Sequence, residues 1–315
     1  MAAEIIDIRH FGPEPFQNLL QAESRAWLQA LRWDYAPSAR LISACLAEKR
    51  LTGYALAEGR HIKGYSFFLY EGEKGLIGDF FVLPGTPDDQ MLNLLDHVIE
   101  TLVGTPGLRR IEAQIPHYPV IALEATFRRS RFNIYSRRFM TFDLNAGTIP
   151  DSPATASGEF SLEEWKRHHD LLASQLIFHT YREHIDAAIN DQYLTPWGCQ
   201  RLLGNIIELR GCGENLPGAS RVAIHKASHK LAGVLAITSV RQGTAHIPQI
   251  AVATEFQSRG LGAALMGSSF RVLASEGYSE VSLTVTDDNA GAVRFYERVG
   301  FVTFQKFGAY VWQRD

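Results

Sequence analysis

The chain has 315 residues, of which 46% are apolar and 21% charged, and its formal net charge is −3. This length is enough for about two domains with buried cores, and the slightly acidic balance excludes a broad basic face for nucleic acid. Because no run of about 18 apolar residues is present, no membrane-spanning segment is expected.

The first residues also argue against a secretory signal, because Glu4, Asp7 and Arg9 interrupt any apolar core there. The chain has an odd number of cysteines, with no CxxC pair and no zinc-ligand spacing: Cys45, Cys199 and Cys212. This pattern predicts free thiols, no metal site and a cytoplasmic location. The sequence does not distinguish a monomer from a homodimer.

The first half, residues 1–147, alternates between helical and strand patterns. Helices are expected at 15–31 and 38–48, followed by strands at LTGYALAE, GYSFFLY and GLIGDFFVL. A helix at 88–103, the strand LRRIEAQI, a short helix near Ala122 and a strand pair ending at MTFDL follow. Such a succession predicts a mixed, mostly antiparallel sheet flanked by helices.

A stretch rich in Pro, Ser, Ala and Gly follows at 145–159 and predicts an exposed linker over 148–158. The second domain, 159–315, then shows helical patterns at 162–176 and 196–210 and strands at 221–225, 231–240 and 244–252. A helix at 259–276, the strand EVSLTV, a helix at 289–299 and two closing strands near Phe304 and Tyr310 complete it. The helical stretch 178–200 is expected to border a substrate pocket.

The spacing of these elements is the same in both halves. Val82 and Ile111 mark the end of one strand and the start of the next in the first half, and Val252 and Val281 do so in the second at the same separation. The sequence therefore predicts an α+β (α/β) protein made of one duplicated, diverged domain. The alternative is a coincidence between two unrelated α/β domains.

The segment AVATEFQSRGLGAAL, residues 251–265, joins an apolar strand directly to a helix. Such a turn leaves backbone N–H groups without partners at the positive end of the helix dipole, where an anion binds well. Gly260 and Gly262 would let phosphate oxygens approach the backbone. The spacing fits neither a P-loop nor a dinucleotide-binding turn, and a glycine turn alone could serve only to pack a helix on a sheet.

A second motif lies in NAGAVRFYERVGF, residues 289–301. Asn289, Ala292, Val293 and Tyr296 follow at helical spacing and share one helix face. Gly300 then tolerates the left-handed conformation that ends a helix. Taken alone, Tyr296 would more simply be a half-buried tyrosine whose hydroxyl bonds to the backbone.

Together the two motifs resemble a known family. Gln257, Gly260 and Gly262 are similar to the Q-x-x-G-x-G acyl-CoA pyrophosphate loop of the GNAT superfamily of N-acyltransferases. Residues 289–301 are similar to the N-x-x-A-x-x-x-Y-x-x-x-G-F helix of that family. The resemblance covers residues 158–315 and implies two GNAT-like domains in tandem, of which the second is catalytic.

The resemblance also implies roles for individual residues. It assigns acetyl-CoA, or another short acyl-CoA, to a site made by Ile250, Ala251, Val252, Gln257, Ser258, Arg259, Gly260, Leu261, Gly262, Ala263, Asn289, Ala292, Phe295 and Tyr296. In this scheme the backbone amide of Val252 polarises the thioester carbonyl. Tyr296 is the general acid that protonates the departing sulfur.

The general base is less defined by the sequence. Relatives often place a carboxylate on the same strand several residues before the loop, and His246 takes about that place here. An imidazole suits proton transfer near neutral pH, although a strand-edge histidine bonded to solvent fits as well. Asp287 and Asp288 are alternatives, with Asp288 expected to cap the following helix, and a water relay without a dedicated base also fits.

The first half lacks the cofactor residues. A shift of 170 residues puts Pro87, Gln90 and Leu92 where the second half has Gln257, Gly260 and Gly262, and puts Asp88 and Asp89 at the helix start. Negative charge there repels a pyrophosphate.

The predicted function is therefore transfer of an acetyl group to a primary amine by one active site. The alternative is a non-catalytic acyl-CoA sensor or assembly module. The acceptor, a small molecule or a peptide, is left open.

Overall fold

The computed structural model describes residues 3–151, 158–208 and 212–314. Its internal contacts group residues 1–137 with 306–315 as unit 1 and residues 138–305 as unit 2. This division differs from a single boundary at 148–158 because the end of the chain pairs with a strand of the first half. Part of the expected linker, 152–157, lies outside the described residues.

Unit 1 contains six strands and four α-helices among its described residues. The strands are β1 (Glu4–Asp7), β2 (Thr52–Glu58), β3 (His61–Glu71), β4 (Lys74–Val82), β5 (Arg110–Ile115) and the end of β13 (Val302–Gln313), in that order across the sheet. The helices are α1 (Gln17–Leu31), α2 (Ala36–Ala47), α3 (Asp88–Gly104) and α4 (Val120–Arg129), with short 3-10 turns η1 (Ile8–His10) and η2 (Glu14–Phe16). All neighbouring strands are antiparallel except β4 and β5.

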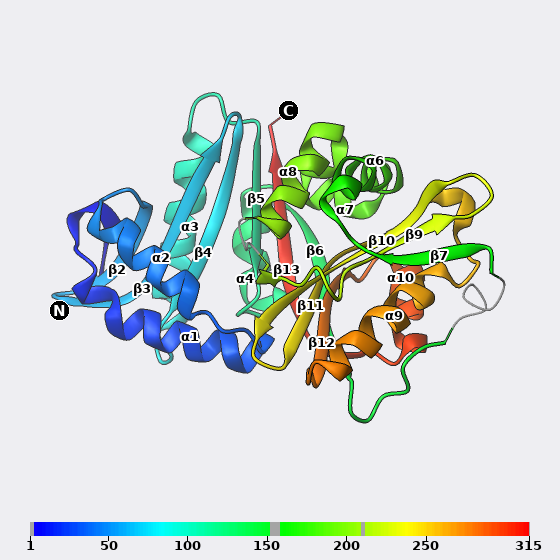
Figure 1. Cartoon of the computed structure of the whole chain (residues 1–315). Coiled ribbons are helices and arrows are strands. Elements are labelled where there is room, and N and C mark those ends of the chain that lie inside the picture. Colours follow the sequence, from blue (N-terminus) through cyan, green and yellow to red (C-terminus); the bar gives the residue numbers. More distant parts are fainter. Residues whose placement is uncertain (1–2, 152–157, 209–211, 315) are drawn as a thin grey trace. The chain divides into compact units, whose positions relative to one another are not determined.

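Helices cover both faces of this sheet (Figure 1). Side chains of α1 and α2 form one apolar cluster with β2 and β3, and side chains of α3 and α4 form another on the opposite face. The last strand belongs to the second cluster. Tyr310 of β13 is fully buried and stacks on Phe127 of α4, with ring centroids 3.7 Å apart.

This packing predicts that Tyr310→Ala destabilises unit 1 by about 3 kcal/mol, because it leaves a cavity where a buried aromatic ring packed. Hydrogen exchange at the amides of β5, the strand that pairs with β13, would measure the loss. Tyr310→Phe is the matched control. The buried Tyr310 hydroxyl has no hydrogen-bond partner among the described residues, so its removal should leave protection unchanged or slightly higher. Equal protection in both variants would contradict the prediction.

Unit 2 repeats this architecture. Its strands are β6 (Asn133–Asp143), β7 (Phe160–Glu164), β8 (Glu214–Asn215), β9 (Arg221–His225), β10 (Lys230–Arg241), β11 (Thr244–Val252) and β12 (Glu280–Thr286). Its helices are α6 (Asp170–Tyr181), α7 (Ile185–Ile189), α8 (Pro196–Ile207), α9 (Leu261–Ser275) and α10 (Ala290–Val299), with 3-10 turns η3 (Arg167–His169), η4 (Asp191–Leu194) and η5 (Thr254–Phe256). The sheet order is β6-β12-β11-β10-β9-β7, and β8 pairs with β10.

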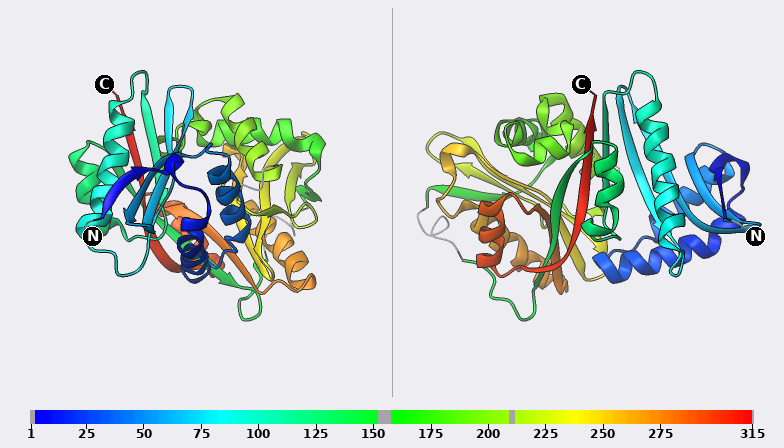
Figure 2. Two further views of the ribbon diagram at one scale, coloured as in Figure 1. Left: turned by 90° about the vertical axis from the view of Figure 1, so that its left-hand side faces the viewer. Right: turned by 180° about the vertical axis from the view of Figure 1, so that it is seen from behind.

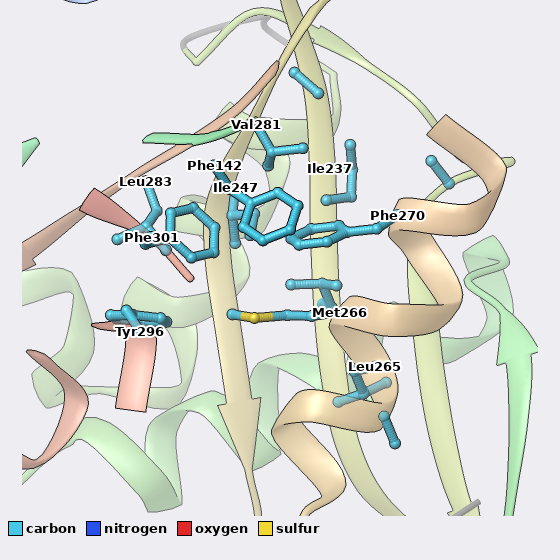
Figure 3. Packing of buried hydrophobic residues seen from close by; sticks show 14 of the residues in the cluster. Phe142, Ile237, Ile247, Leu265, Met266, Phe270, Val281, Leu283, Tyr296 and Phe301 are labelled. Carbon is cyan, nitrogen blue, oxygen red and sulfur yellow. The ribbon is translucent and has the colours of Figure 1, made fainter. Parts of the chain in front are cut away.

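The two faces of the unit 2 sheet are covered by different helices (Figure 2). Helices α6 and α8 pack on one face, while α9 and α10 pack on the other. Figure 3 shows the second of these clusters, where the rings of Phe142, Phe270 and Phe301 lie together. Tyr296 of α10 contacts this cluster edge-on, 5.9 Å from the Phe301 ring. The core therefore fixes the helix that carries the expected acid.

Two helix predictions for unit 2 are wrong in their extent. Residues 160–164 form strand β7, paired with β9, because Phe160 alternates into the core while Ser161 points away; α6 begins only at Asp170. The stretch 178–200 is broken into the end of α6, α7, η4 and the start of α8. Asn190 and Thr195 cap new turns there and Pro196 opens α8.

The closing strands also differ from the prediction. A single strand, β13, takes the place of two strands near Phe304 and Tyr310, and a single strand, β6, takes the place of the pair ending at MTFDL. The expected helix 196–210 ends at Ile207, and residues 209–211 lie outside the described residues. Gly308, the glycine inside β13, does not adopt a positive φ angle, so the chain continues there in extended form.

The predicted duplication is confirmed by the strand register. In unit 1 the parallel pair runs from Lys74 opposite Arg110 to Ile77 opposite Ala113. In unit 2 it runs from Thr244 opposite Glu280 to Ile247 opposite Leu283. Every position is shifted by 170 residues, and in both units the pairing stops after the same four positions. Within the described part of the chain, no helix has the length and apolarity needed to cross a membrane.

Candidate active site

The site is built around a gap in the unit 2 sheet. Strands β11 and β12 pair only as far as Ile247 and Leu283, although both strands continue. The N–H of Ala253 donates to the carbonyl of Ala232 over 2.9 Å. Because bonding alternates along an antiparallel pair, the backbone groups of Ile250 and Val252 face away from β10. They point toward the side where β12 has separated.

Two of the carbonyls at this gap already have side-chain partners. The Tyr181 hydroxyl donates to the Ile250 carbonyl over 2.8 Å. The Gln257 amide nitrogen donates to the Val252 carbonyl over 3.1 Å, so Gln257 stabilises the end of the strand as well as belonging to the loop. The N–H of Val252 is thereby held in a fixed direction, toward the gap.

The predicted loop and helix start follow at once. Ser258 and Gly260 adopt positive φ angles of 62° and 80°, and α9 begins at Leu261. The first internal bond joins the N–H of Ala264 to the Gly260 carbonyl. Within residues 3–151, 158–208 and 212–314, no protein acceptor is recorded for the backbone N–H groups of Leu261, Gly262 and Ala263. Three parallel donors at a helix start suit a diphosphate.

Side chains of this loop also make contacts within the protein. Arg259 forms an ion pair with Glu159 at 2.8 Å and lies over the Phe256 ring. A Cβ atom at Gly262 would lie 3.1 Å from Cζ of Phe295. The missing side chain at Gly262 therefore allows α10 to pack closely on α9. The Phe295 ring in turn lies 5.3 Å from the ring of Tyr296.

The second motif forms α10 as predicted, with one correction to its start. The Asn289 side-chain oxygen accepts from the N–H of Ala292 over 3.1 Å and caps the helix, so Asn289 and not Asp288 is the cap. Ala292 packs against the apolar cluster that contains Tyr296. Tyr296 is only 8% exposed. Burial, and then the nearby Asp186 carboxylate, raise the pKa of its phenol well above the usual range, so the phenol stays protonated.

The candidate bases lie in contrasting surroundings. His246 is 6% exposed, its Nδ1 lies 2.9 Å from the Ser282 hydroxyl, and its ring is parallel to Phe139. It therefore sits in the paired part of β11, before the gap opens. The Asp287 carboxylate forms an ion pair with Arg138.

Several side chains at the gap were not expected from the sequence. Segment 181–193, which we call the wall segment, runs from the end of α6 through α7 into η4. Tyr193 donates to the Gln249 side chain over 2.9 Å, and its ring stacks on Tyr181. The Thr286 hydroxyl donates to Asp186 over 2.6 Å. Gln249, a buried amide within the strand 244–252, is a sequence signal that could have indicated this arrangement.

Unit 1 has a cleft at the equivalent strand end but not the same donors. The cleft has a volume of about 950 Å³ and is lined by α1, the start of α3, and His117 and Tyr118 after β5. Pro87 precedes α3, and Asp88 and Asp89 occupy its first turn. Proline offers no N–H, and the two carboxylates oppose a diphosphate.

Comparisons with known proteins agree with this architecture. The Acetyltransferase (GNAT) family model matches residues 188–301. N-alpha-acetyltransferase 30 of Schizosaccharomyces pombe is 29% identical over 83 residues, 25% of this chain and 55% of that protein. Mycothiol acetyltransferase of Frankia casuarinae is 44% identical over 55 residues, 18% of this chain and 16% of that protein. The matches thus span about half and about one sixth of these curated relatives.

A solved structure is similar over the whole chain. The tandem GNAT protein from the clavulanic acid biosynthesis pathway has a TM-score of 0.60 at 16% identity, covering 99% of this chain and 98% of that one. At this identity the likeness concerns the fold. Residues 188–301 are therefore similar to the GNAT acetyltransferase family, and the chain has a fold similar to that of a tandem GNAT protein.

Proposed function

We propose that the chain transfers an acetyl group from acetyl-CoA, or another short acyl group from its CoA thioester, to a primary amine at one active site in residues 159–315. The observation that supports this most strongly is the gap beside β11. It combines backbone groups of Ile250 and Val252 facing the gap with three N–H donors at the start of α9. The backbone groups of Ile250 and Val252 suit an amide-containing arm, and the N–H groups at the start of α9 suit a diphosphate. A CoA ester contains both of these parts.

In this proposal bound acyl-CoA supplies the activated carbonyl and a thiol leaving group. The Val252 N–H donates to the carbonyl oxygen as negative charge develops on it. The N–H groups of Leu261, Gly262 and Ala263 hold the diphosphate. Tyr296 keeps its proton at neutral pH and delivers it to the departing sulfur.

Binding and turnover should be measured separately. Calorimetry with CoA is expected to give one site per chain, and thiol release from acetyl-CoA should depend on an added amine. A panel containing a peptide with a free α-amine, an amino acid, glucosamine and a polyamine spans the main acceptor classes. The S. pombe relative carries N-alpha-acetyltransferase in its name, which is why the peptide is included.

The results separate the alternatives. CoA binding with amine-dependent thiol release supports the transferase. CoA binding without turnover by any amine would indicate a sensor or assembly module. A folded chain that gives no heat with CoA would contradict both. We also propose that unit 1 is a degenerate copy without a cofactor loop, so a stoichiometry of one CoA per chain is expected and two would oppose it.

A further inference from the structure

A separate pocket of unit 2 adjoins the first turn of α9. Its volume is about 570 Å³, which is within the usual range for a small-ligand site. Ala263 lines this pocket, together with residues 147–151 and the last turn of α10. Ala263 also carries one of the three N–H groups that are proposed to hold the diphosphate. A molecule held by that turn can therefore extend into this pocket as well as along β11.

The segment that forms one wall of the pocket is held against α9. The carbonyl of Pro150 lies so close to Gly267 that a Cβ atom there would be 2.0 Å from its oxygen. Ile149 packs against the apolar cluster of unit 2, and Asp151 forms an ion pair with Arg271 of α9. This wall is therefore part of the packed surface of unit 2, although the sequence predicts an exposed linker there.

The inner surface of the pocket combines aromatic and aliphatic side chains. Phe295 and Val299 of α10 line it, and so does Phe142, whose ring belongs to the cluster shown in Figure 3. Phe295 lies over Gly262, where a Cβ atom would be 3.1 Å from its ring. A flat heterocyclic base can stack on an aromatic ring of this kind.

Arg298 supplies positive charge to the pocket. It is exposed, and its guanidinium has no hydrogen-bond or ion-pair partner in the part of the chain that the structure describes. The acid that lines the pocket, Asp151, is already paired with Arg271. Glu297, the acid next to Arg298 on α10, pairs with Arg138. The guanidinium of Arg298 is therefore available to an anionic group of a ligand.

We propose that this pocket receives the adenosine end of CoA, with the base against Phe295 and the 3′-phosphate on Arg298. The inference rests on the proposed function, which puts the diphosphate at the start of α9. In CoA the diphosphate joins the pantetheine arm to the ribose, so an arm that follows β11 leaves the adenosine to the pocket. Arg298 then makes the site selective for CoA over analogues that lack the 3′-phosphate.

Calorimetry with three successively shorter ligands tests the assignment. They are CoA, dephospho-CoA, which lacks the 3′-phosphate, and 4′-phosphopantetheine, which also lacks the adenosine. The wild type should bind CoA about 10-fold more tightly than dephospho-CoA, because it loses one exposed, charge-assisted contact with the shorter ligand. 4′-Phosphopantetheine should bind more weakly again, because the stacked base is lost as well.

Arg298→Gln should remove the preference for CoA over dephospho-CoA. We expect its Kd for CoA to rise about 10-fold, while its Kd for dephospho-CoA stays within about two-fold of the wild type and shows that the site is intact. Arg294→Gln is the matched control. It removes the same charge from the same helix, but Arg294 does not line the pocket, so this variant should keep the preference.

The phosphorus spectrum of bound CoA gives a second readout, which a purely structural role of Arg298 would not change. A phosphate monoester loses its last proton at about pH 6, and a guanidinium beside it favours the fully ionised form. The pH midpoint of the 3′-phosphate signal should therefore fall when CoA binds the wild type. In the complex with Arg298→Gln it should stay close to the value for free CoA.

The outcomes separate this inference from the proposed function. A preference for CoA that only Arg298→Gln removes supports the pocket assignment, whether or not any amine is acetylated. Equal wild-type affinities for CoA and dephospho-CoA, a preference that survives in Arg298→Gln, or an equal loss in Arg294→Gln would each overturn the assignment and leave the transferase intact. A folded chain that binds none of the three ligands would overturn both.

Discussion

Replacing Tyr296 with phenylalanine is expected to lower kcat by about 100-fold or more while leaving the Kd for CoA within about two-fold of the wild type. The ring packs in the apolar cluster beside Phe301, and phenylalanine preserves that packing. Only the proton donor is lost. Thiol release measured with a saturating amine, together with calorimetry for CoA, gives the two numbers.

The pH dependence of the wild type tests the same role. Because burial and Asp186 raise the pKa of the Tyr296 phenol, the acid form persists as the pH rises, and no alkaline loss of kcat from this group is expected in ordinary assay buffers. Tyr278→Phe, at a half-buried tyrosine just before β12, is the matched control and should retain full activity. Equal turnover in Tyr296→Phe and wild type would remove Tyr296 from the mechanism.

The strand, loop and helix of residues 250–263 could be predicted because the signals are local. An apolar strand, a positive-φ glycine and a helix start follow each other within a few residues, and their geometry depends little on the rest of the chain. The same holds for α10, where Asn289, Tyr296 and Gly300 mark the cap, the buried face and the end of the helix. The shift of 170 residues between the halves could be read from spacing alone.

What could not be predicted depends on contacts between distant residues. Nothing local indicates that β13 pairs with β5 rather than only with its own half. His184 and Asn289 are 105 positions apart and Asp186 and Thr286 are 100 apart, so only the folded chain shows that they meet. Phe160 and Leu162 begin a strand because β9 lies beside them. In each case the residues that a segment contacts in the folded chain decide its structure, and the intrinsic propensity of its own residues does not.

The comparison of the two units indicates what distinguishes the proposed CoA site of unit 2 from the equivalent place in unit 1. Both units keep the short parallel pair and the gap after it. They differ in the first turn of the following helix, which contains Leu261, Gly262 and Ala263 in α9 but two aspartates in α3. A single acidic side chain placed in α9 should therefore reproduce part of the difference.

Ala263→Asp makes this change at the third residue of α9. An acidic side chain in the first turn favours the helix dipole and should stabilise unit 2 by about 0.5 kcal/mol. The same charge faces the diphosphate that the N–H groups are proposed to hold. Two unit charges about 6 Å apart at an effective dielectric of about 20 repel by about 3 kcal/mol, which corresponds to a Kd about 100-fold higher.

Calorimetry with CoA and thermal unfolding of the same variant measure the two opposite effects. Ala263→Asn is the neutral control of equal size and should bind CoA nearly as the wild type does. Added salt should reduce the defect of the aspartate variant because it screens exposed charges, and pantetheine, which lacks the diphosphate, should bind both variants alike. If Ala263→Asp bound CoA normally, the start of α9 would not be the anion site, and its N–H groups would be only the donors without intrahelical partners that begin every α-helix.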